Sequence, residues 1–189
     1  MIGLFGGSFD PIHHGHLIVA RSVFETLGLA ELRFVVAREQ PFKLGQHRAP
    51  PEARARMVEL AIAGDPALRL ERIELEREGP SYTVDTLRAL RAREPGAAFA
   101  LLVGADAAQE LPQWREAETL HRLATLVLVA RPGVVLPRLP WAVRSVTVPA
   151  IEISATEVRQ RVRAGLPIRY WVPDAVAAYI ASEGLYRAR

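Results

Sequence analysis

Short apolar runs alternate with segments of helical periodicity along almost the whole of this 189-residue chain. The runs at 98–103 and 125–130 are almost entirely apolar, which is typical of central parallel strands that helices cover on both faces. This alternation predicts an α/β fold with a doubly wound, mostly parallel sheet. We expect strands at 2–5, 33–37, 68–75, 98–103, 125–130 and 143–148, and helices at 14–27, 50–63, 83–93, 117–123, 156–164 and 174–183.

The length predicts a single domain over residues 1–189, with a C-terminal helical portion at about 154–189. A domain of this size buries enough surface to fold without disulfides or a structural metal. The chain contains no cysteine, which excludes cysteine-ligated zinc sites, iron–sulfur clusters and thiol catalysis.

Apolar runs in the sequence are all shorter than a membrane span, and the first residues lack the charged region and cleavage site of a signal peptide. We therefore expect a cytoplasmic protein with no membrane partner. The net charge is +3, but charges of opposite sign alternate over residues 69–74, as on solvated, ion-paired faces. This pattern argues against a nucleic-acid partner. The sequence leaves the oligomeric state open, with a homo-oligomer as one alternative.

Residues 6–16, GGSFDPIHHGH, lie between the first expected strand and the first expected helix. In doubly wound sheets, ligands bind at the carboxyl ends of the strands. The glycines let backbone N–H groups approach a ligand, and the helix that follows presents its positive end. His13 and His16 add two imidazoles, so the motif predicts a phosphate site. The alternatives are a glycine turn with surface histidines and a metal site that includes Asp10; the P-loop pattern is absent.

A second motif, ISATEVR, occupies residues 153–159. Ser154 and Glu157 have the spacing of a capping box, so the motif predicts a helix start. A helix N-terminus with hydroxyl groups and Arg159 one turn later is also suited to hold an anion. The two interpretations are compatible.

A third group of residues follows the buried run at 98–103. Gly104 and Asp106 lie where an acid commonly holds a ribose hydroxyl, and Trp114 is suited either to stack on a planar ring or to fill the core. Three polar residues at the start of the helix expected at 83–93 either line the same cavity or cap that helix: Tyr82, Thr83 and Thr86. Lys43 is either a phosphate contact or an ordinary surface lysine.

The motifs resemble the signatures of a known superfamily. GGSFDPIHHGH contains HxGH in His13, Gly15 and His16, and ISATEVR resembles ISxTxxR; together they mark the nucleotidylyltransferases. The first motif also resembles the HIGH element of class I aminoacyl-tRNA synthetases, but the chain is too short for one and lacks a KMSKS-like loop. Residues 80–87, 104–114 and 129–133 look like those of the bacterial nicotinate mononucleotide adenylyltransferase family.

This resemblance implies a Rossmann-like nucleotidylyltransferase fold. It also implies adenylyl transfer from ATP to nicotinate mononucleotide, which gives deamido-NAD and pyrophosphate in NAD biosynthesis. Three residues are implied to be catalytic: His13, His16 and Arg159. The residues implied to bind ATP are Gly6, Gly7, Ser8, Phe9, His13, His16, Lys43, Gly104, Asp106, Ile151, Ser154, Thr156 and Arg159. Those implied to bind the mononucleotide are Tyr82, Thr83, Thr86, Asp106, Trp114 and Arg131.

Two positions depart from the family pattern. Phe42 stands where a histidine often precedes the basic residue, which leaves an ATP contact at Lys43 open, and Ala155 replaces a common serine. We expect no protein metal site: Mg²⁺ would arrive on the ATP oxygens and keep most of its waters. The attacking phosphate is already ionised, so the chemistry requires positioning and charge stabilisation rather than a general base.

Other functions fit the same residues. The acceptor could instead be nicotinamide mononucleotide, used alone or alongside the acid form, or another phosphate such as phosphopantetheine. A nucleotide-binding or RNA-binding module without catalysis is the third alternative, and a steep salt dependence of RNA affinity would favour it.

Overall fold

The computed structural model describes residues 1–41 and 45–188 and contains one sheet of six strands. Every pair of neighbouring strands is parallel, in the order β3-β2-β1-β4-β5-β6. The doubly wound sheet predicted from the sequence is thus confirmed. The strands are β1 (Ile2–Gly7), β2 (Glu31–Val36), β3 (Leu68–Glu71), β4 (Phe99–Gly104), β5 (Thr125–Ala130) and β6 (Val143–Thr147).

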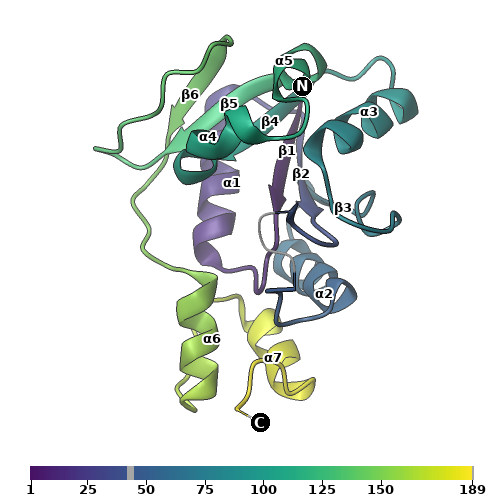
Figure 1. Ribbon diagram of the computed structural model, residues 1–189. Helices are drawn as coiled ribbons and strands as arrows, with labels where there is room; N and C mark the ends of the chain where they lie inside the picture. The colour runs from purple at the N-terminus through teal and green to yellow at the C-terminus, as the bar shows by residue number, and fades with distance from the viewer. Residues whose placement is uncertain (42–44, 189) are drawn as a thin grey trace.

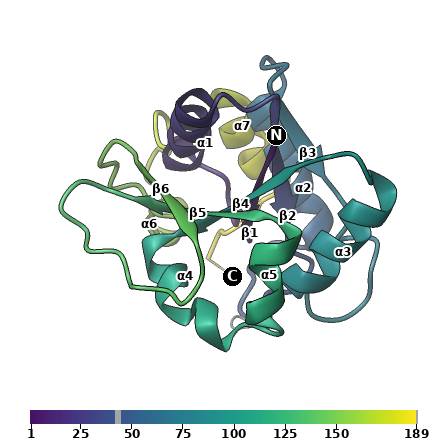
Figure 2. The same ribbon diagram turned by 90° about the horizontal axis from the view of Figure 1, so that it is seen from above.

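Helices connect the strands and cover both faces of the sheet (Figures 1 and 2). Figure 2 shows α1 and α7 on one side of the strands and α4 and α5 on the other. The helices are α1 (His14–Leu27), α2 (Pro51–Ile62), α3 (Thr83–Arg93), α4 (Ala105–Glu110), α5 (Ala117–Leu123), α6 (Ala155–Arg163) and α7 (Asp174–Ser182), with a 3₁₀ turn at Leu111–Gln113.

Two hydrophobic cores lie on opposite faces of the sheet because successive strand residues point to opposite sides. In β4, Ala100 and Leu102 belong to the core beneath α1 and α2, whereas Leu101 and Val103 belong to the core beneath α3 and α5. This arrangement explains why the central strands are apolar throughout.

Helix ends follow the signals in the sequence. Gly28 ends α1 with a φ of 58°, a conformation that glycine adopts without steric cost. Ser154 begins α6, and its side chain accepts a hydrogen bond from the Glu157 N–H at 3.1 Å. The helix start predicted at this motif is therefore confirmed.

The strand expected at 68–75 is shorter than predicted. β3 ends at Glu71, where the Glu71 carboxylate accepts a bond from the Ile73 N–H at 3.1 Å. The Leu75 N–H then bonds to the Arg72 carbonyl at 2.7 Å, which turns the backbone away from the sheet. The sequence prediction also missed α4 and the 3₁₀ turn that follows it, because segments this short show little helical periodicity.

The direction of the chain across the sheet reverses at β1. The chain runs outward from β1 through β2 to β3, and then returns to build β4, β5 and β6 on the other side. The carboxyl ends of β1 and β4 therefore border the crevice in which such sheets bind ligands. In Figure 1, α6 and α7 lie below this edge of the sheet.

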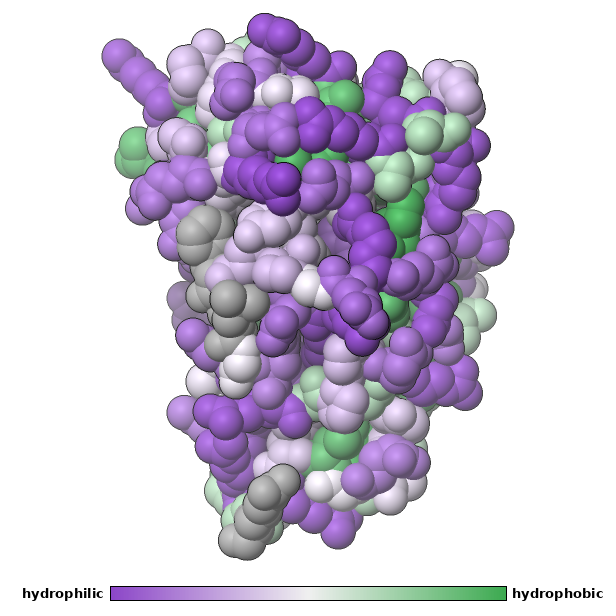
Figure 3. All heavy atoms as spheres, turned by 45° about the vertical axis from the view of Figure 1, so that its right-hand side comes forward, coloured by the Kyte–Doolittle hydropathy of each residue, from purple (hydrophilic) through white to green (hydrophobic). Residues whose placement is uncertain are grey.

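The face of the molecule drawn in Figure 3 is largely hydrophilic, and the hydrophobic side chains visible on it form only small, separate patches. Of the helices in the described part of the chain, none has the length and apolar character needed to span a bilayer.

Candidate active site

A continuous cleft of adjoining cavities follows the carboxyl ends of β1 and β4. Its central cavity has a volume of about 600 Å³ and is lined by Asp106, Thr156 and Arg159 and by residues 6–9, which we call the glycine loop. A cavity of about 240 Å³ at one end shares His16 and Asp106 with the central one. Two cavities of about 80 and 370 Å³ at the other end share Trp114, and the smaller adjoins the central cavity at Gly6 and Gly7.

The glycine loop is shaped by Phe9. The Phe9 side chain is buried, and its backbone φ is 48°, in the left-handed region. A Cβ atom on Gly7 would lie only 2.8 Å from the Phe9 ring, so glycine is required there for this packing. Ser8 donates a hydrogen bond to Gln40 Oε1 at 2.7 Å and lies 3.1 Å from His47 Nε2. All four loop residues, from Gly6 to Phe9, line the central cavity.

The two histidines of the HxGH motif form a stacked pair. Their ring centroids are 3.7 Å apart, and the backbone N–H of His13 donates a hydrogen bond to His16 Nδ1 at 3.2 Å. In the neutral His16 ring, the proton is therefore on Nε2, which makes that atom a hydrogen-bond donor. Gly15 makes room for the pair, because a Cβ there would approach His13 Nδ1 to 3.0 Å.

Both imidazoles are neutral at pH 7 in the ligand-free protein. Burial, with a smaller contribution from the charge of His14, lowers the pKa of His13 from 6.5 to about 4. Burial and the neighbouring His13 also hold the pKa of His16 well below its usual value. Each ring is thus an N–H donor, and nearby phosphate charge would raise both pKa values.

Arg159 projects from α6 toward the glycine loop. Its Nη1 donates to the main-chain oxygen of Asp10 at 2.7 Å, and its Nη2 donates to Thr156 Oγ1 at 3.0 Å. Arg159 and Thr156 therefore face the central cavity as a fixed pair. Ser154 acts as the cap of α6, and Ala155 also lines the cavity.

The cavity of about 240 Å³ beside the histidines is lined by the residues expected at a ribose. Gly104 and Asp106, at the β4–α4 junction, line both this cavity and the central one. Ile151 lines it from the segment before α6. Arg131 also lines this cavity, so the structure brings it together with Asp106 but not with the other four residues expected to bind the mononucleotide.

Those other residues meet at the opposite end of the cleft. Thr83 and Trp114 line both of the cavities there, while Tyr82 lines the larger and Thr86 the smaller. Tyr82, the N-cap residue of α3, makes no side-chain hydrogen bond to the first turn of the helix. The Asp85 N–H bonds to the Tyr82 carbonyl at 3.1 Å, so within residues 1–41 and 45–188 the N–H groups of Thr83 and Val84 are the uncapped ones.

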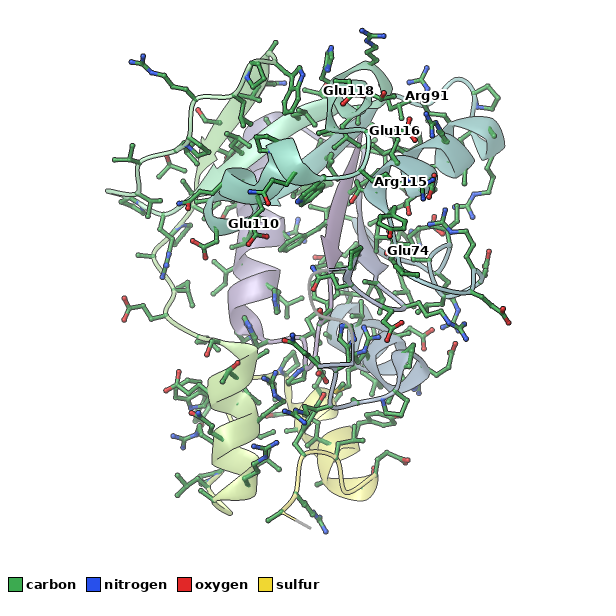
Figure 4. All side chains as sticks on the ribbon, in the orientation of Figure 1. Glu74, Arg91, Glu110, Arg115, Glu116 and Glu118 are labelled. Atoms are coloured by element: carbon green, nitrogen blue, oxygen red, sulfur yellow. The ribbon has the colours of Figure 1, made fainter. Side chains whose placement is uncertain are left out.

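Sequence reasoning missed a buried polar cluster beneath this end. Glu74 is 8% exposed and lines the smaller cavity. The Thr86 hydroxyl donates to Glu74 Oε1 at 2.7 Å and accepts from Arg77 Nη2 at 2.6 Å. Burial raises the pKa of Glu74, although Thr86, Ser81 and Arg77 oppose this effect. Figure 4 shows Glu74 on the same side of the molecule as α3.

Lys43 and Phe42 lie outside the described residues. In the parts of the chain described, no group of three or more His, Asp or Glu side chains is placed to hold a metal ion. The donors along the cleft are imidazole, guanidinium, hydroxyl and backbone N–H groups, which suit phosphate oxygens rather than a bare cation.

The sequence and the fold are both similar to those of known proteins. The pattern of the cytidylyltransferase-like family matches residues 4–161. A Thermus thermophilus protein named "probable nicotinate-nucleotide adenylyltransferase" is 50% identical over 186 residues, which cover 98% of this chain and 99% of the relative. A Geobacillus thermodenitrificans protein of the same name is 47% identical over 188 residues, covering 100% of this chain and 87% of the relative.

Solved structures confirm the fold. The Plasmodium falciparum nicotinic acid mononucleotide adenylyltransferase complexed with NaAD has a TM-score of 0.80 at 22% identity, with 98% of this chain and 96% of that chain covered. The same enzyme complexed with APC has a TM-score of 0.79 at 21% identity, with the same shares covered. From the match over residues 4–161 and the full-length relatives, the chain belongs to the cytidylyltransferase-like family and, within it, to the nicotinate-nucleotide adenylyltransferases.

Proposed function

We propose that this protein transfers the adenylyl group of ATP to nicotinate mononucleotide, giving deamido-NAD and pyrophosphate. The observation that carries this proposal is the continuous cleft, which joins a phosphate-binding centre to an uncapped helix N-terminus beside Trp114. A single cleft of this kind can hold two nucleotides with their phosphates adjacent. The full-length relatives with the matching name support the same activity.

The central cavity would hold the triphosphate of ATP. Arg159 and Thr156 supply donors from one side, and the glycine loop lies opposite them. His16 Nε2, fixed as a donor by the His13 N–H, is placed to stabilise charge on the α-phosphate. Mg²⁺ would enter with ATP as part of the substrate. Removing a single donor of this kind costs on the order of 10²–10³ in rate.

The reaction would be a direct in-line displacement. The phosphate oxygen of the mononucleotide attacks the α-phosphorus of ATP, and the bond to the bridging oxygen of pyrophosphate breaks. The attacking group is already ionised at neutral pH, so no proton must be removed. The protein's contribution is to align the two nucleotides and to stabilise the charge that develops on the phosphate oxygens.

The opposite end of the cleft would hold the mononucleotide. Trp114 would stack on the pyridine ring, and Tyr82 and Thr83 would border it. The uncapped N–H groups of α3 favour an anion, so a pyridine carboxylate would gain more there than a carboxamide. This difference supports the acid form of the mononucleotide over the amide. Arg131 lines the cavity at the other end of the cleft together with Gly104, Asp106 and Ile151, so we assign it to the adenosine side.

The test is pyrophosphate release from Mg·ATP, measured with nicotinate mononucleotide, nicotinamide mononucleotide and phosphopantetheine in parallel. We expect the highest kcat/KM with the nicotinate form. The His16→Ala variant should lose the activity, while His121→Ala, in the distant helix α5, should retain it. Absence of pyrophosphate release with all three acceptors would refute the proposed reaction.

A further inference from the structure

The carboxylate of Asp10 is buried beside the central cavity, although a negative charge there would oppose phosphate binding. Asp10 is 5% exposed and lies in the loop between β1 and α1. Its oxygens accept hydrogen bonds from the N–H groups of Arg48 at 2.8 Å and Ala49 at 3.1 Å. A third donor, the hydroxyl of Tyr186, lies 2.7 Å from Asp10 Oδ1. The Asp10 carboxylate is thus held by three hydrogen-bond donors of the protein itself.

Tyr186 reaches Asp10 from the other end of the chain. The two residues are 176 positions apart, and Tyr186 follows α7 in the C-terminal segment. Figure 1 shows the segment that follows α7 beside α6 and α7, below the carboxyl edge of the sheet. The Tyr186 side chain is buried and its φ is 63°, a conformation that bulky residues rarely adopt. Its hydroxyl is therefore held in place by the surrounding structure.

Tyr186 can only donate to Asp10. Burial and the adjacent Asp10 carboxylate raise the pKa of Tyr186, so the phenol keeps its proton at every pH at which the protein works. The positive charges of Arg159 and Arg54 oppose this shift, which indicates that both guanidinium groups lie near the same pair.

The main chain of Asp10 extends these contacts to the phosphate site. The Asp10 carbonyl accepts the bond from Arg159 Nη1 at 2.7 Å, and Arg159 Nη2 contacts Thr156. On the other side of the loop, buried Arg54 donates to the carbonyls of Ser8 and Ala37, each at 2.7 Å. The position of the Asp10 backbone therefore sets where the Arg159 guanidinium points.

We infer that Tyr186 is a positioning residue for the phosphate site: its hydroxyl fixes the Asp10 carboxylate, and the Asp10 carbonyl in turn aims Arg159 at the nucleotide phosphates. The inference rests on the proposed function, because it assigns the central cavity to ATP. It makes the C-terminal segment part of the nucleotide site, although none of the described residues of that segment, up to 188, lines the central cavity.

The test is the affinity for Mg·ATP, measured by calorimetry without a mononucleotide so that no turnover occurs. Tyr186→Phe removes only the hydroxyl. Because a hydrogen bond to a charged group is involved, we expect the Kd for ATP to rise about tenfold. Tyr179→Phe, in α7, is the matched control that removes a hydroxyl from another, half-buried tyrosine of the C-terminal part. Its Kd should stay within about twofold of wild type, because the contacts of Asp10 with Tyr186 and Arg159 are kept.

A second comparison separates positioning from a general loss of stability. In an Arg159→Ala background, adding Tyr186→Phe should leave the Kd for ATP unchanged, because the effect passes through the missing guanidinium. In steady state, Tyr186→Phe should raise the KM for ATP without raising the KM for the mononucleotide. An unchanged Kd in folded Tyr186→Phe, or a full additional effect in the Arg159→Ala background, would overturn the inference.

This experiment is independent of the acceptor. If wild type binds Mg·ATP but does not use nicotinate mononucleotide, the proposed function fails while the affinity ratios still test the role of Tyr186. If wild type does not bind Mg·ATP, the assignment of the central cavity and the inference fail together.

Discussion

The two ends of the cleft are built in different ways. The phosphate end, where the triphosphate of ATP is proposed to bind, is formed mainly by two short sequence motifs at residues 6–16 and 153–159. Its geometry is fixed by backbone groups: the backbone N–H of His13 holds His16, and the Asp10 carbonyl holds Arg159. The mononucleotide end, where the mononucleotide is proposed to bind, is supported by buried Glu74 and Thr86 and by half-buried Arg77, which are joined by hydrogen bonds. On the proposed function, one end would present donors directly to the reacting phosphates, whereas the other would shape a binding surface.

This difference predicts different kinetic effects. Groups that interact more strongly with the transition state than with the substrates change kcat, while groups that bind both equally change only KM. Substitutions at the histidines should therefore lower kcat, and substitutions beneath the mononucleotide end should change KM for that substrate.

The largest expected effect follows removal of His16. In His16→Ala, kcat should fall on the order of 10²–10³, as for the loss of one donor to a developing charge. The measurement is steady-state pyrophosphate release, with circular dichroism to establish that the variant is folded. A folded His16→Ala variant with near-normal kcat would contradict the role assigned to the HxGH pair.

The stability of the ligand-free protein should depend on the protonation of His13. The pKa of His13 is about 4 in the folded protein, against the usual value of 6.5 that applies to the unfolded chain. Between these two pH values, the unfolded chain therefore binds one more proton than the folded protein. Stability is therefore highest above pH 6.5 and falls as the pH decreases toward 4, by about 3 kcal/mol from this group.

Urea unfolding of wild type and His13→Gln from pH 7 to pH 4 measures this contribution. The variant should lose less stability than wild type over the range. Identical pH profiles would show that His13 is not held neutral by burial.

Arg159 should affect one substrate more than the other. Arg159→Ala removes a charged donor from the central cavity, so KM for ATP should rise about tenfold or more, with a much smaller change in KM for the mononucleotide. Arg163→Ala, one turn further along α6 and exposed, is the matched control. Equal increases in both KM values would remove the distinction between the two ends.

The smallest effect is expected at Glu74. Glu74→Gln keeps an oxygen that can accept the Thr86 hydrogen bond, so KM for the mononucleotide should change by less than about tenfold, the value of one net hydrogen bond.

Because burial raises the pKa of Glu74, ionisation of this carboxyl lowers the stability of the protein as the pH rises above the usual pKa of 4.5. Glu74→Gln should remove this loss, and unfolding at pH 5 and pH 8 measures it.

The fold and the phosphate end could be predicted from the sequence because their signals are local. Helices α1, α3 and α5 and strand β5 have the bounds that periodicity indicates, and the HxGH spacing brings His13 and His16 together within one helical turn. The histidine pair also begins α1, so one short motif determines both the local structure and the donors.

The remaining contacts depend on tertiary structure. The sequence predicts Glu74 as one of the charged positions of an alternating strand, but β3 ends at Glu71 and the turn that follows carries Glu74 into the interior. Tyr186 meets Asp10 across 176 residues, and Arg131 reaches the opposite end of the cleft from Trp114. No local pattern encodes these contacts, because each depends on how separate elements pack.

The most direct test of the central claim is a competition between the two pyridine mononucleotides. Wild type would be incubated with Mg·ATP and equal concentrations of the nicotinate and nicotinamide forms, and the two dinucleotide products would be separated and quantified. We predict that deamido-NAD exceeds NAD by more than about tenfold, a difference of about 1.4 kcal/mol in transition-state stabilisation. Equal amounts of the two products, or neither product, would contradict the account.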